Sequence, residues 1–533
     1  MIPRRAAWLG FLLLALLIAY HLLALHRFGL ATVGGITYPL LDDDVMISMH
    51  YGRNLAQGEG LVYNRGEAVE GFTNPLLTFV AAVLHLLPVP PPVIAWLLIL
   101  LNLALSLGIA LLLMRFWGDS PTEKIAGLIG AGFYVTLPHH AFFAYAGYEV
   151  YMQAALLLFV LRRIERMGLP EALALGLLPL THGLGLVAWA VLVGALCLLP
   201  AESLHKRVLL AGLALAPALA YELFRLWYYG EPLPNTYWLK AGSGSLAGGV
   251  RYLLAWGGVV SPLALLGAYP LIARCERRVA LMWLVLAAHA LAVMALGGDI
   301  FPQYRFLFPC SALLAALAGR GVAQILACRP ASSLRWQPGV LLAVTAAVAY
   351  AGLWKPFSSY RDSLPELEEN RRWIIRHLAL GLAIGRNTSP HATIAVFGLG
   401  YLGYYGGRYC IDMLGKTDRH IARVPPVPER PIGHNKTDFD YVLARSPDFI
   451  ELDMEPPIDL EDTEGLREEQ HDPYGYSADL ALHPVFRRVY GPHPVRDVKG
   501  RPLSLYAKSR AASRSWRVAP AYFTGVSENS PHP

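Results

Sequence analysis

The sequence predicts an α-helical polytopic membrane protein that ends in a smaller α/β domain. Of its 533 residues, 55% are hydrophobic and only 16% are charged, which is not the balance of a soluble globular protein. Apolar stretches of roughly 20 residues, the length that crosses a bilayer, recur as far as about residue 350. The rest of the chain is more polar and contains many prolines, and this change in composition predicts a domain boundary.

Eleven apolar segments are predicted to cross the membrane. The first is followed by His26 and Arg27 and not by a small-residue cleavage site, so we expect a retained helix rather than a signal peptide. The predicted spans are residues 7–26, 93–115, 124–140, 148–164, 169–181, 184–201, 208–227, 255–273, 279–297, 306–327 and 338–355.

Basic loops set the predicted orientation, because lysine and arginine concentrate in cytoplasmic loops. Five loops are rich in these residues: 115–124, 162–166, 205–207, 274–278 and 328–335. Eleven crossings place all five on the cytoplasmic side together with the N-terminus, and leave the chain after residue 355 outside. The apolar stretch 75–87 is too short to span, so we expect an interfacial or re-entrant helix in the first external loop, residues 33–92.

The charge and the cysteines point to no further class of site. The net charge of +6 reflects mostly the basic loops, so it does not indicate nucleic-acid binding. The five cysteines are an odd number without metal-ligand spacing, and we expect them to be small buried hydrophobic residues.

The most unusual polar motif is a run of three carboxylates, Asp42, Asp43 and Asp44, soon after the first span. Neighbouring like charges and partial burial raise the pKa of a carboxyl group toward neutrality, which suits a general base. The same residues could instead cap the helix that follows, because acidic side chains bind the free N–H groups of a helix N-terminus. Three caps are more than one helix requires.

Other polar residues lie in loops on the predicted external side. They are His50, Arg53, Asn54, Glu70 and Asn74 in the first loop, then His139, His140, Tyr148, Glu149, Thr181 and His182, and finally residues 234–240, Asp299, Tyr304 and Arg305. Ionisable residues at membrane depth are costly and usually functional. Because five separate stretches emerge on one side, we expect them to form a single composite site.

These residues resemble a known family. Residues 42–64 (DDDVMISMHYGRNLAQGEGLVYN) and 69–74 (VEGFTN) are similar to the first-loop signature of GT-C glycosyltransferases. More narrowly, they resemble the terminal arabinofuranosyltransferases of the mycobacterial cell wall and their bacterial relatives. Further similar islands follow in order as far as about residue 450: 225–230, 234–236 with Lys240, 298–299, 304–306, 407–408, 411–418, 420–423 and 433–434.

The resemblance implies a polyprenyl-phosphate sugar donor, with arabinofuranose as the expected sugar. It also implies that the sugar is transferred at the periplasmic face of the inner membrane, to a glycan or glycoprotein acceptor. One departure bears on the sugar or the acceptor. Residues 180–185 read Leu-Thr-His-Gly-Leu-Gly, whereas family members often have Leu-Thr-Arg-Pro-Glu-Gly, so a guanidinium and a carboxylate are both replaced.

Sugar transfer from a phosphate needs a base for the acceptor hydroxyl and cations for the departing phosphate. We expect Asp43 or Asp44 to be the base, with Asp42 beside them. Arginine and lysine suit phosphate, and the candidates are Lys240, Arg305 and Arg53, although such residues also mark a membrane interface. The expected sugar or acceptor contacts are Glu149, His182, Asn235, Asp299, Tyr404 and Arg408, and packing or capping remains the alternative for each.

No metal or other cofactor is expected. Carboxylates such as the Asp triplet can bind a metal, but a donor with one phosphate carries less charge than a diphosphate and needs a metal less.

The polar C-terminal part predicts a small α/β domain. An amphipathic helix is predicted over residues 364–380, and the segments 391–398, 408–413, 439–443 and 503–507 are predicted to form its α/β layer, the first two as strands. The predicted organisation is therefore a membrane domain at 1–355, a periplasmic domain at 356–510 and a disordered tail at 511–533.

Three other functions remain as alternatives. A related GT-C enzyme could transfer mannose or another hexose from a polyprenyl phosphate. A lipid-linked sugar transporter would also be polytopic, but it should show inverted repeats and polar residues near the bilayer midplane. A structural or sensor protein would have no need of the Asp triplet or of external lysine and arginine residues.

Overall fold

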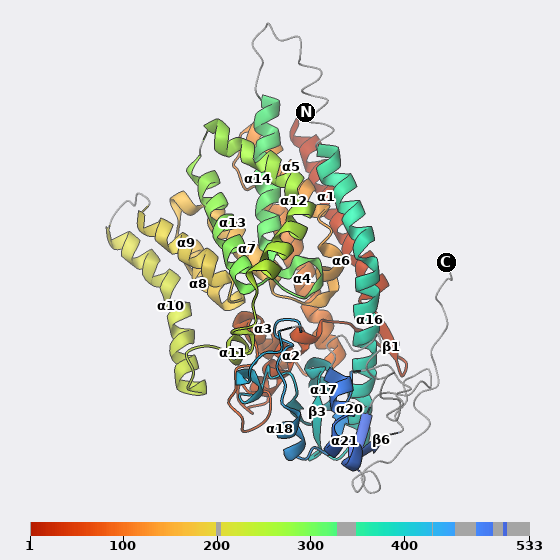
Figure 1. Cartoon of the computed structure of the whole chain (residues 1–533). Coiled ribbons are helices and arrows are strands. Elements are labelled where there is room, and N and C mark those ends of the chain that lie inside the picture. Colours follow the sequence, from red (N-terminus) through yellow and green to blue (C-terminus); the bar gives the residue numbers. More distant parts are fainter. Residues whose placement is uncertain are drawn as a thin grey trace.

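The computed structural model describes residues 2–198, 204–274, 276–327, 348–428, 430–453, 476–493 and 505–508. Long helices fill the upper part of Figure 1 and a small sheet lies below them, with the short helices of the first external loop in between. The predicted loop 328–335, most of the predicted span 338–355 and the predicted tail 511–533 lie outside the described residues.

A helix overlaps each of the first ten predicted spans. These helices are α1 (Ile2–Phe28), α4 (Pro91–Met114), α5 (Pro121–Val135), α7 (Val150–Arg162), α8 (Leu169–Thr181), α9 (Gly185–Leu198), α10 (Leu204–Tyr229), α12 (Leu246–Arg274), α13 (Arg277–Leu296) and α14 (Phe308–Ala327). The short helix α6 (His140–Ala146) precedes α7 and is bent from it by 108°.

Within the described residues, six helices are long and apolar enough to cross a membrane, and the bent pair α6–α7 would make a seventh. The helices α5, α7, α8 and α9 have only 13 to 15 residues. At 1.5 Å per residue such helices are roughly 20–23 Å long, whereas the hydrocarbon core is about 30 Å thick. A total of eleven crossings therefore remains a prediction.

Small residues let α14 lie at the centre of the bundle. A Cβ atom on Gly319 of α14 would lie 2.3 Å from the carbonyl oxygen of Ala126 and 2.6 Å from the backbone nitrogen of Gly130, both on α5. Helices in membranes associate through such small residues, because lipid is as apolar as a leucine side chain and close backbone packing has to supply the attraction.

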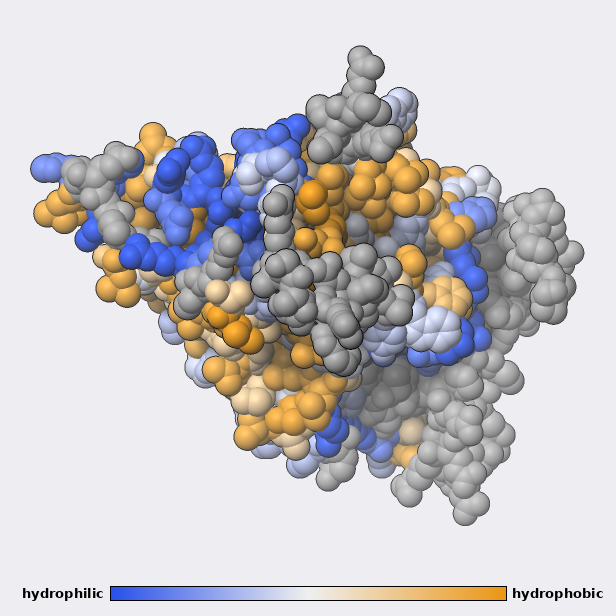
Figure 2. Space-filling model, turned by 90° about the horizontal axis from the view of Figure 1, so that it is seen from above, coloured by the Kyte–Doolittle hydropathy of each residue, from blue (hydrophilic) through white to orange (hydrophobic). Residues whose placement is uncertain are grey.

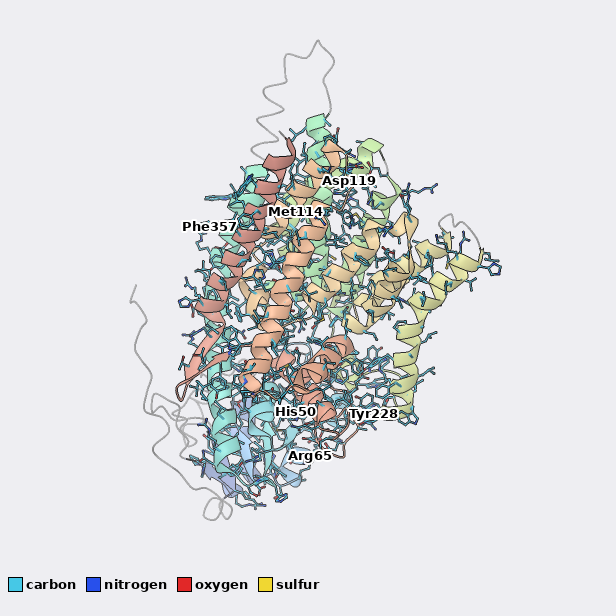
Figure 3. All side chains as sticks on the ribbon, turned by 180° about the vertical axis from the view of Figure 1, so that it is seen from behind. His50, Arg65, Met114, Asp119, Tyr228 and Phe357 are labelled. Atoms are coloured by element: carbon cyan, nitrogen blue, oxygen red, sulfur yellow. The ribbon has the colours of Figure 1, made fainter. Side chains whose placement is uncertain are left out.

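Three of the predicted cytoplasmic loops meet at one end of the bundle. Nη1 of Arg278 donates to the carbonyl oxygens of Phe116 (3.1 Å) and Arg162 (3.0 Å), and its guanidinium lies over the Trp117 ring. Seen from this end, hydrophilic residues gather over part of the face between apolar flanks (Figure 2). Asp119 lies near this end in Figure 3, whereas residues of the first external loop lie toward the other.

The first external loop forms a hairpin and two helices near the lower end of the bundle. Strands β1 (Leu30–Val33) and β2 (Ile36–Pro39) pair antiparallel, and α2 (Asp43–Ala56) and α3 (Pro75–His85) follow. The expected interfacial helix at 75–87 corresponds to α3, whose 11 residues are too few to span. Its end leaves Val83 and Leu86 more than 60% exposed, as an apolar tip held at a membrane surface would be.

The chain leaves the bundle in one long helix, α16 (Lys355–Asn387), which runs beside α1 in Figure 1. At the outer end of α1, Arg27 forms an ion pair with Glu368 of α16 at 3.6 Å. One continuous helix therefore runs past residue 355, and the position of the membrane boundary along it stays a prediction. The predicted amphipathic helix 364–380 is the middle of α16.

Five short strands form the sheet of the C-terminal part, in the order β4–β3–β5–β7–β6. They are β3 (Thr393–Val396), β4 (Tyr409–Asp412), β5 (Phe449–Glu451), β6 (Tyr490–Pro492) and β7 (Leu505–Lys508). The first three run parallel, and β7 is antiparallel to both of its neighbours. The predicted segments 391–398, 408–413 and 503–507 overlap β3, β4 and β7.

The predicted segment 439–443 contributes a helix to this layer. It is α18 (Phe439–Ala444), and Asp438 caps it by accepting the backbone N–H of Tyr441. The capping acid before the apolar residues is the signal for this helix. The strand that joins the sheet here is β5, which begins five residues after α18 ends.

A helix with a glycine face joins the two parts of the molecule. Helix α17 (Leu399–Gly406) packs against α2, and its glycines allow the contact. A Cβ atom on Gly400 would lie 2.1 Å from the carbonyl oxygen of Asp43, and one on Gly403 would lie 1.6 Å from the hydroxyl of Tyr63. That hydroxyl donates to the carbonyl oxygen of Leu399 at 2.7 Å.

Gly403→Ala is therefore expected to destabilise the protein by about 1–3 kcal/mol, the usual cost of overpacking, because the methyl group would overlap the Tyr63 hydroxyl. Thermal unfolding in detergent measures the effect. Tyr63→Phe in the same chain should recover part of the loss. The control is Gly108→Ala, a helix position whose Cβ would meet nothing within 4 Å. Equal stability of the Gly403 and Gly108 variants would contradict this packing.

Candidate functional site

Asp42 is the N-cap of α2. Its Oδ1 accepts the backbone N–H of Asp44 at 3.1 Å and the hydroxyl of Tyr148 at 2.5 Å, and the residue is 2% exposed. Burial and then the nearby charge of Asp44 raise the pKa of Asp42 to about 7. One of the three carboxylates thus occupies the capping position.

Asp43 connects α2 to the C-terminal part of the chain. Its two carboxylate oxygens accept the backbone N–H groups of Gly400 (3.0 Å) and Tyr401 (2.9 Å), in the first turn of α17. Burial raises the pKa of Asp43, opposed by the charge of Lys416 and by these two hydrogen bonds. With both oxygens taken by backbone donors, this carboxylate is engaged in holding the two parts together.

Asp44 lies between two cations. Nζ of Lys416 is 2.6 Å from its Oδ1, and Nη1 of Arg305 is 3.2 Å from its Oδ2. Burial alone would raise the pKa of Asp44, but Lys416 and Arg305 outweigh it and hold the pKa far below its usual value. The Asp44 side chain is 24% exposed, so it is accessible from outside the protein.

Arg305 is fixed by a second carboxylate and by aromatic rings. Its Nε and Nη2 donate to the two oxygens of Asp299 at 2.9 and 3.2 Å. The guanidinium lies 4.3 Å from the centre of the Phe301 ring and 4.7 Å from that of Tyr148. The two preceding residues, Gln303 and Tyr304, have φ of 61° and 55°, and such strained backbone is found where a structure must aim one side chain.

Lys240 ends the short helix α11 (Asn235–Lys240) and faces the same cluster. Its ammonium group lies 5.7 Å from the centre of the Phe306 ring, and a Cβ on Gly433 would meet its Cε at 3.3 Å. Burial and then the charge of Arg305 lower the pKa of Lys240. Among the residues that the structure describes, no carboxylate pairs with this ammonium group.

A tight loop of the C-terminal part carries Lys416 into the cluster. Asp412 shapes the loop by accepting the backbone N–H groups of Leu414, Gly415 and Thr417. Nδ2 of Asn235 lies 2.9–3.1 Å from the carbonyl oxygens of Gly415, Lys416 and Asp418 and holds the loop from the other side. Since Asn235 opens α11, the same short helix positions both Lys240 and Lys416.

Glu149 and His182 occupy the edge of this cluster. Oε2 of Glu149 accepts from Nδ2 of Asn74 at 2.9 Å, and Oδ1 of Asn74 accepts the hydroxyl of Ser48 at 2.7 Å. The His182 ring lies 5.1 Å from that of Phe306, and its Nδ1 accepts the backbone N–H of Leu184. His182 has charged neighbours here, but the structure gives it no hydrogen bond to a charged group.

Three of the predicted site residues lie elsewhere. Arg53 donates to the carbonyl oxygen of Tyr404 at 2.6 Å and stacks on the Tyr404 ring, about 13 Å along α2 from Asp44 at 1.5 Å per residue. The hydroxyl of Tyr404 bonds to His85. Arg408 donates to the carbonyl oxygens of Gly385 and Thr388 at the end of α16.

The sequence offered a weak signal for Lys416, the site residue that it did not single out. Lys416 lies in the Gly-Lys-Thr-Asp segment 415–418, which belongs to one of the islands of family resemblance. A lysine in a tight turn between two aspartates is a plain cue for a fixed cation, but the chain gives no sign that this turn reaches Asp44, 372 residues earlier.

One further polar cluster has metal-ligand residue types. Nε2 of His377 lies 3.5 Å from Oε1 of Glu451 and 3.7 Å from Oδ1 of Asp453, all three buried. Asp453 already accepts from the Trp373 indole and from Arg376, so its oxygens are largely used. Burial lowers the pKa of His377, but the hydrogen bond to Glu451 and the charges of Asp453 and Glu451 outweigh it and raise that pKa, so the cluster is a polar contact between α16 and the sheet.

Comparison with known proteins shows the fold. A family model described as a domain of unknown function (DUF8728) matches residues 366–505. No curated protein matches the chain. The structure of ArnT from Cupriavidus metallidurans in the apo state is 14% identical, covers 97% of this chain and 100% of its own, and superposes with a TM-score of 0.55.

Two more solved structures are similar. ArnT from Cupriavidus metallidurans bound to undecaprenyl phosphate is 15% identical, with 75% of this chain and 85% of that chain covered and a TM-score of 0.50. The Archaeoglobus fulgidus oligosaccharyltransferase tethered with an acceptor peptide is 12% identical, with 94% and 74% covered and a TM-score of 0.47. The likeness to ArnT shows that the chain has the helical membrane fold of the GT-C glycosyltransferases.

Asp42→Asn should flatten the pH dependence of stability. The pKa of Asp42 is raised on folding to about 7, so the wild type loses stability as the pH rises from about 4 through 7, by at most about 4 kcal/mol at 1.36 kcal/mol per unit. Asparagine keeps an oxygen for both hydrogen bonds and does not titrate. The measurement is the melting temperature in detergent at pH 5 and pH 8. The melting temperature of the variant relative to that of the wild type should be higher at pH 8 than at pH 5. Parallel pH profiles for the two proteins would contradict the raised pKa.

Proposed function

We propose that this protein is an integral-membrane glycosyltransferase that moves a sugar from a polyprenyl-phosphate donor to a hydroxyl group of an external glycan or glycoprotein. The favoured sugar is a pentofuranose, most simply arabinofuranose, because the first-loop and tail motifs resemble the enzymes that transfer it. The proposed site faces the periplasm from the inner membrane. The likeness to an ArnT structure that holds undecaprenyl phosphate supports a lipid-phosphate donor.

The observation that carries this proposal is a lysine without an ion-pair partner beside two paired cations. Arg305 and Lys416 form ion pairs with Asp44, and Arg305 also pairs with Asp299, whereas Lys240 pairs with no carboxylate among the described residues. A half-buried ammonium without a counterion is costly, so a ligand that supplies one negative charge fits this place. A phosphodiester supplies one, and its oxygens suit lysine and arginine donors.

Asp44 is the carboxylate best placed to act as the base. Asp42 caps a helix and Asp43 binds backbone N–H groups, whereas Asp44 is 24% exposed and adjoins the proposed phosphate-binding cations. In the proposed step Asp44 removes the proton from the acceptor hydroxyl. The acceptor oxygen forms a bond to the anomeric carbon while the bond from that carbon to the phosphate oxygen breaks.

The electron pair of the broken bond stays on the phosphate, so polyprenyl phosphate leaves with an additional negative charge. Arg305 and Lys240 stabilise that charge where it develops. Glu149 and Asn235 line the surroundings and are proposed sugar or acceptor contacts. Asp299 is proposed to act by holding Arg305, with which it forms two hydrogen bonds.

A hexosyl donor is the second candidate. The observation that favours it is the histidine at position 182. At this position related enzymes often place an arginine followed by a proline and a glutamate. Here the neutral His182 ring packs on Phe306 at the edge of the cluster, which changes the shape and charge that a sugar would meet.

Asp44→Asn should abolish transfer while the protein stays folded. Loss of a general base typically costs about 10²–10⁴-fold in rate. The assay is release of undecaprenyl phosphate from synthetic arabinofuranosyl undecaprenyl phosphate by purified protein, repeated with mannosyl undecaprenyl phosphate. Asp42→Asn is the matched control and should stay active. Activity of Asp44→Asn equal to wild type would exclude Asp44 as the base. If the wild type releases no undecaprenyl phosphate from either donor, the proposed glycosyltransferase function is contradicted.

Lys240→Gln should weaken the use of donor more than it alters folding. A hydrogen bond to a charged group contributes about 1.5–3 kcal/mol, so the apparent donor affinity should fall roughly 10- to 100-fold. The check is the donor concentration for half-maximal rate, with melting temperature as the control for folding. Because Lys240 has no ion-pair partner among the described residues, its loss should not lower the melting temperature; a large drop there would mean that Lys240 is structural.

A further inference from the structure

Asp44 cannot act as a base in the arrangement that the structure shows. One of its oxygens is 2.6 Å from the Lys416 ammonium and the other is 3.2 Å from the Arg305 guanidinium. A carboxylate in two ion pairs has little tendency to accept a proton. The unliganded site therefore needs a change before the proposed chemistry can occur.

The two cations are held by groups other than Asp44. Arg305 has two hydrogen bonds to Asp299 and is enclosed by the rings of Tyr148 and Phe301. The backbone of Lys416 is fixed by Asn235. If Asp44 is released, Arg305 keeps its partners and the backbone of Lys416 stays in place, so both cations remain within reach of an anion at this position.

An anion can reach the cations from outside. The side chains of Asp44, Lys416 and Arg305 are 24%, 15% and 7% exposed, so the pairs are open at one side. Lys240, without an ion-pair partner among the described residues, is a charge neighbour of Lys416 and Arg305 and adds to the attraction.

We propose that Lys416 is a phosphate-binding residue of the site. Until the donor binds, the carboxylate of Asp44 occupies the position between the cations that the donor phosphate later takes. The donor phosphate takes the Lys416 ammonium and Nη1 of Arg305 from Asp44, and Asp44 is thereby released to accept the acceptor proton. This inference rests on the proposed function, because the anion it invokes is the phosphate of a lipid-linked sugar. Donor binding then switches on the base, and an empty site stays inactive toward water and acceptor.

Charge and atoms balance in this sequence. The bound donor is a phosphodiester with one negative charge. Asp44 gains the proton that the acceptor hydroxyl loses, and the phosphate gains the electron pair of the broken bond to the anomeric carbon. The leaving group then has two negative charges opposite Lys416, Arg305 and Lys240, which is why three cations serve the product side of the reaction.

The same arrangement makes the C-terminal part of the chain a component of the site. Lys416 lies on the loop that follows β4, and Asp412 of that strand shapes the loop. Contact between α17 and α2 brings this loop to Asp44. The membrane helices alone would present an incomplete set of phosphate ligands.

The test is equilibrium binding of undecaprenyl phosphate to the purified full-length protein in detergent, followed by intrinsic fluorescence. Lys416→Gln should weaken binding about tenfold or more, the effect of losing a charged hydrogen bond. Asp44→Asn should do the opposite and tighten binding severalfold, because the competing carboxylate is gone, although the same variant is inactive in transfer. Asp44→Ala is a second variant with the same expected direction.

The control is Lys508→Gln, a half-buried lysine at the end of β7 in the same part of the chain, which should bind as the wild type does. Weaker or unchanged binding by folded Asp44→Asn and Asp44→Ala would overturn the place-holding role. Unchanged binding by Lys416→Gln would overturn its role as a ligand. If the wild type transfers sugar but these shifts are absent, only this inference fails; if the wild type neither binds the lipid phosphate nor transfers sugar, the proposed function fails first.

Discussion

The contact between α2 and α17 is the constraint on which the rest of the site depends. Asp43 is a half-buried carboxylate, and a carboxylate withdrawn from water needs hydrogen-bond donors at its oxygens. The backbone N–H groups of Gly400 and Tyr401 supply them, and glycine is required there because a Cβ would strike Asp43 itself. Once these two helices are in contact, the loop after β4 reaches Asp44, and Lys416 enters a cluster whose other members come from the membrane part.

Three chemically identical aspartates thus acquire three different environments from their partners. Asp42 meets a helix N-terminus and a tyrosine hydroxyl, Asp43 meets backbone donors, and Asp44 meets two cations. Burial raises the pKa of the first two, whereas ion pairs hold that of the third down. The three side chains can lie this close because two cations pair with Asp44, while hydrogen-bond donors meet Asp42 and Asp43.

Much of the fold follows from patterns of short range. Apolar runs locate the helices of the membrane part, and basic loops mark one end of it, where Arg278 joins two of them. Short-range patterns also have clear limits. The composition change at 355 does not mark the end of a helix, because α16 begins at Lys355 and continues past its ion pair with Arg27. Asp438 makes residues 439–443 a helix, although their apolar pattern also fits a strand.

The candidate site was predictable in its members but not in its pairings. Sequence patterns point to Asp44, Arg305 and Lys240, since charged residues in external loops are unusual. They cannot distinguish Asp43 from Asp44, because the groups that decide between them, Gly400 and Lys416, lie more than 350 residues away along the chain. For the same reason Lys416 resembles any other lysine in a turn until the sheet and α17 are in place.

Helix α11 carries both a cation of the site and residue types that are common at a membrane surface. The helix has six residues, ends in Lys240 and carries Tyr237 and Trp238, residue types that gather at the boundary of lipid and water. Tyr237 is 49% exposed, while Asn235 and Leu239 are buried. An exposed aromatic ring and a cation of the site thus lie within one helix of six residues. A lipid-linked phosphate has the same two properties, an apolar chain and an anionic head, so it matches this helix at both of its faces, whereas a soluble sugar phosphate would match only the cation.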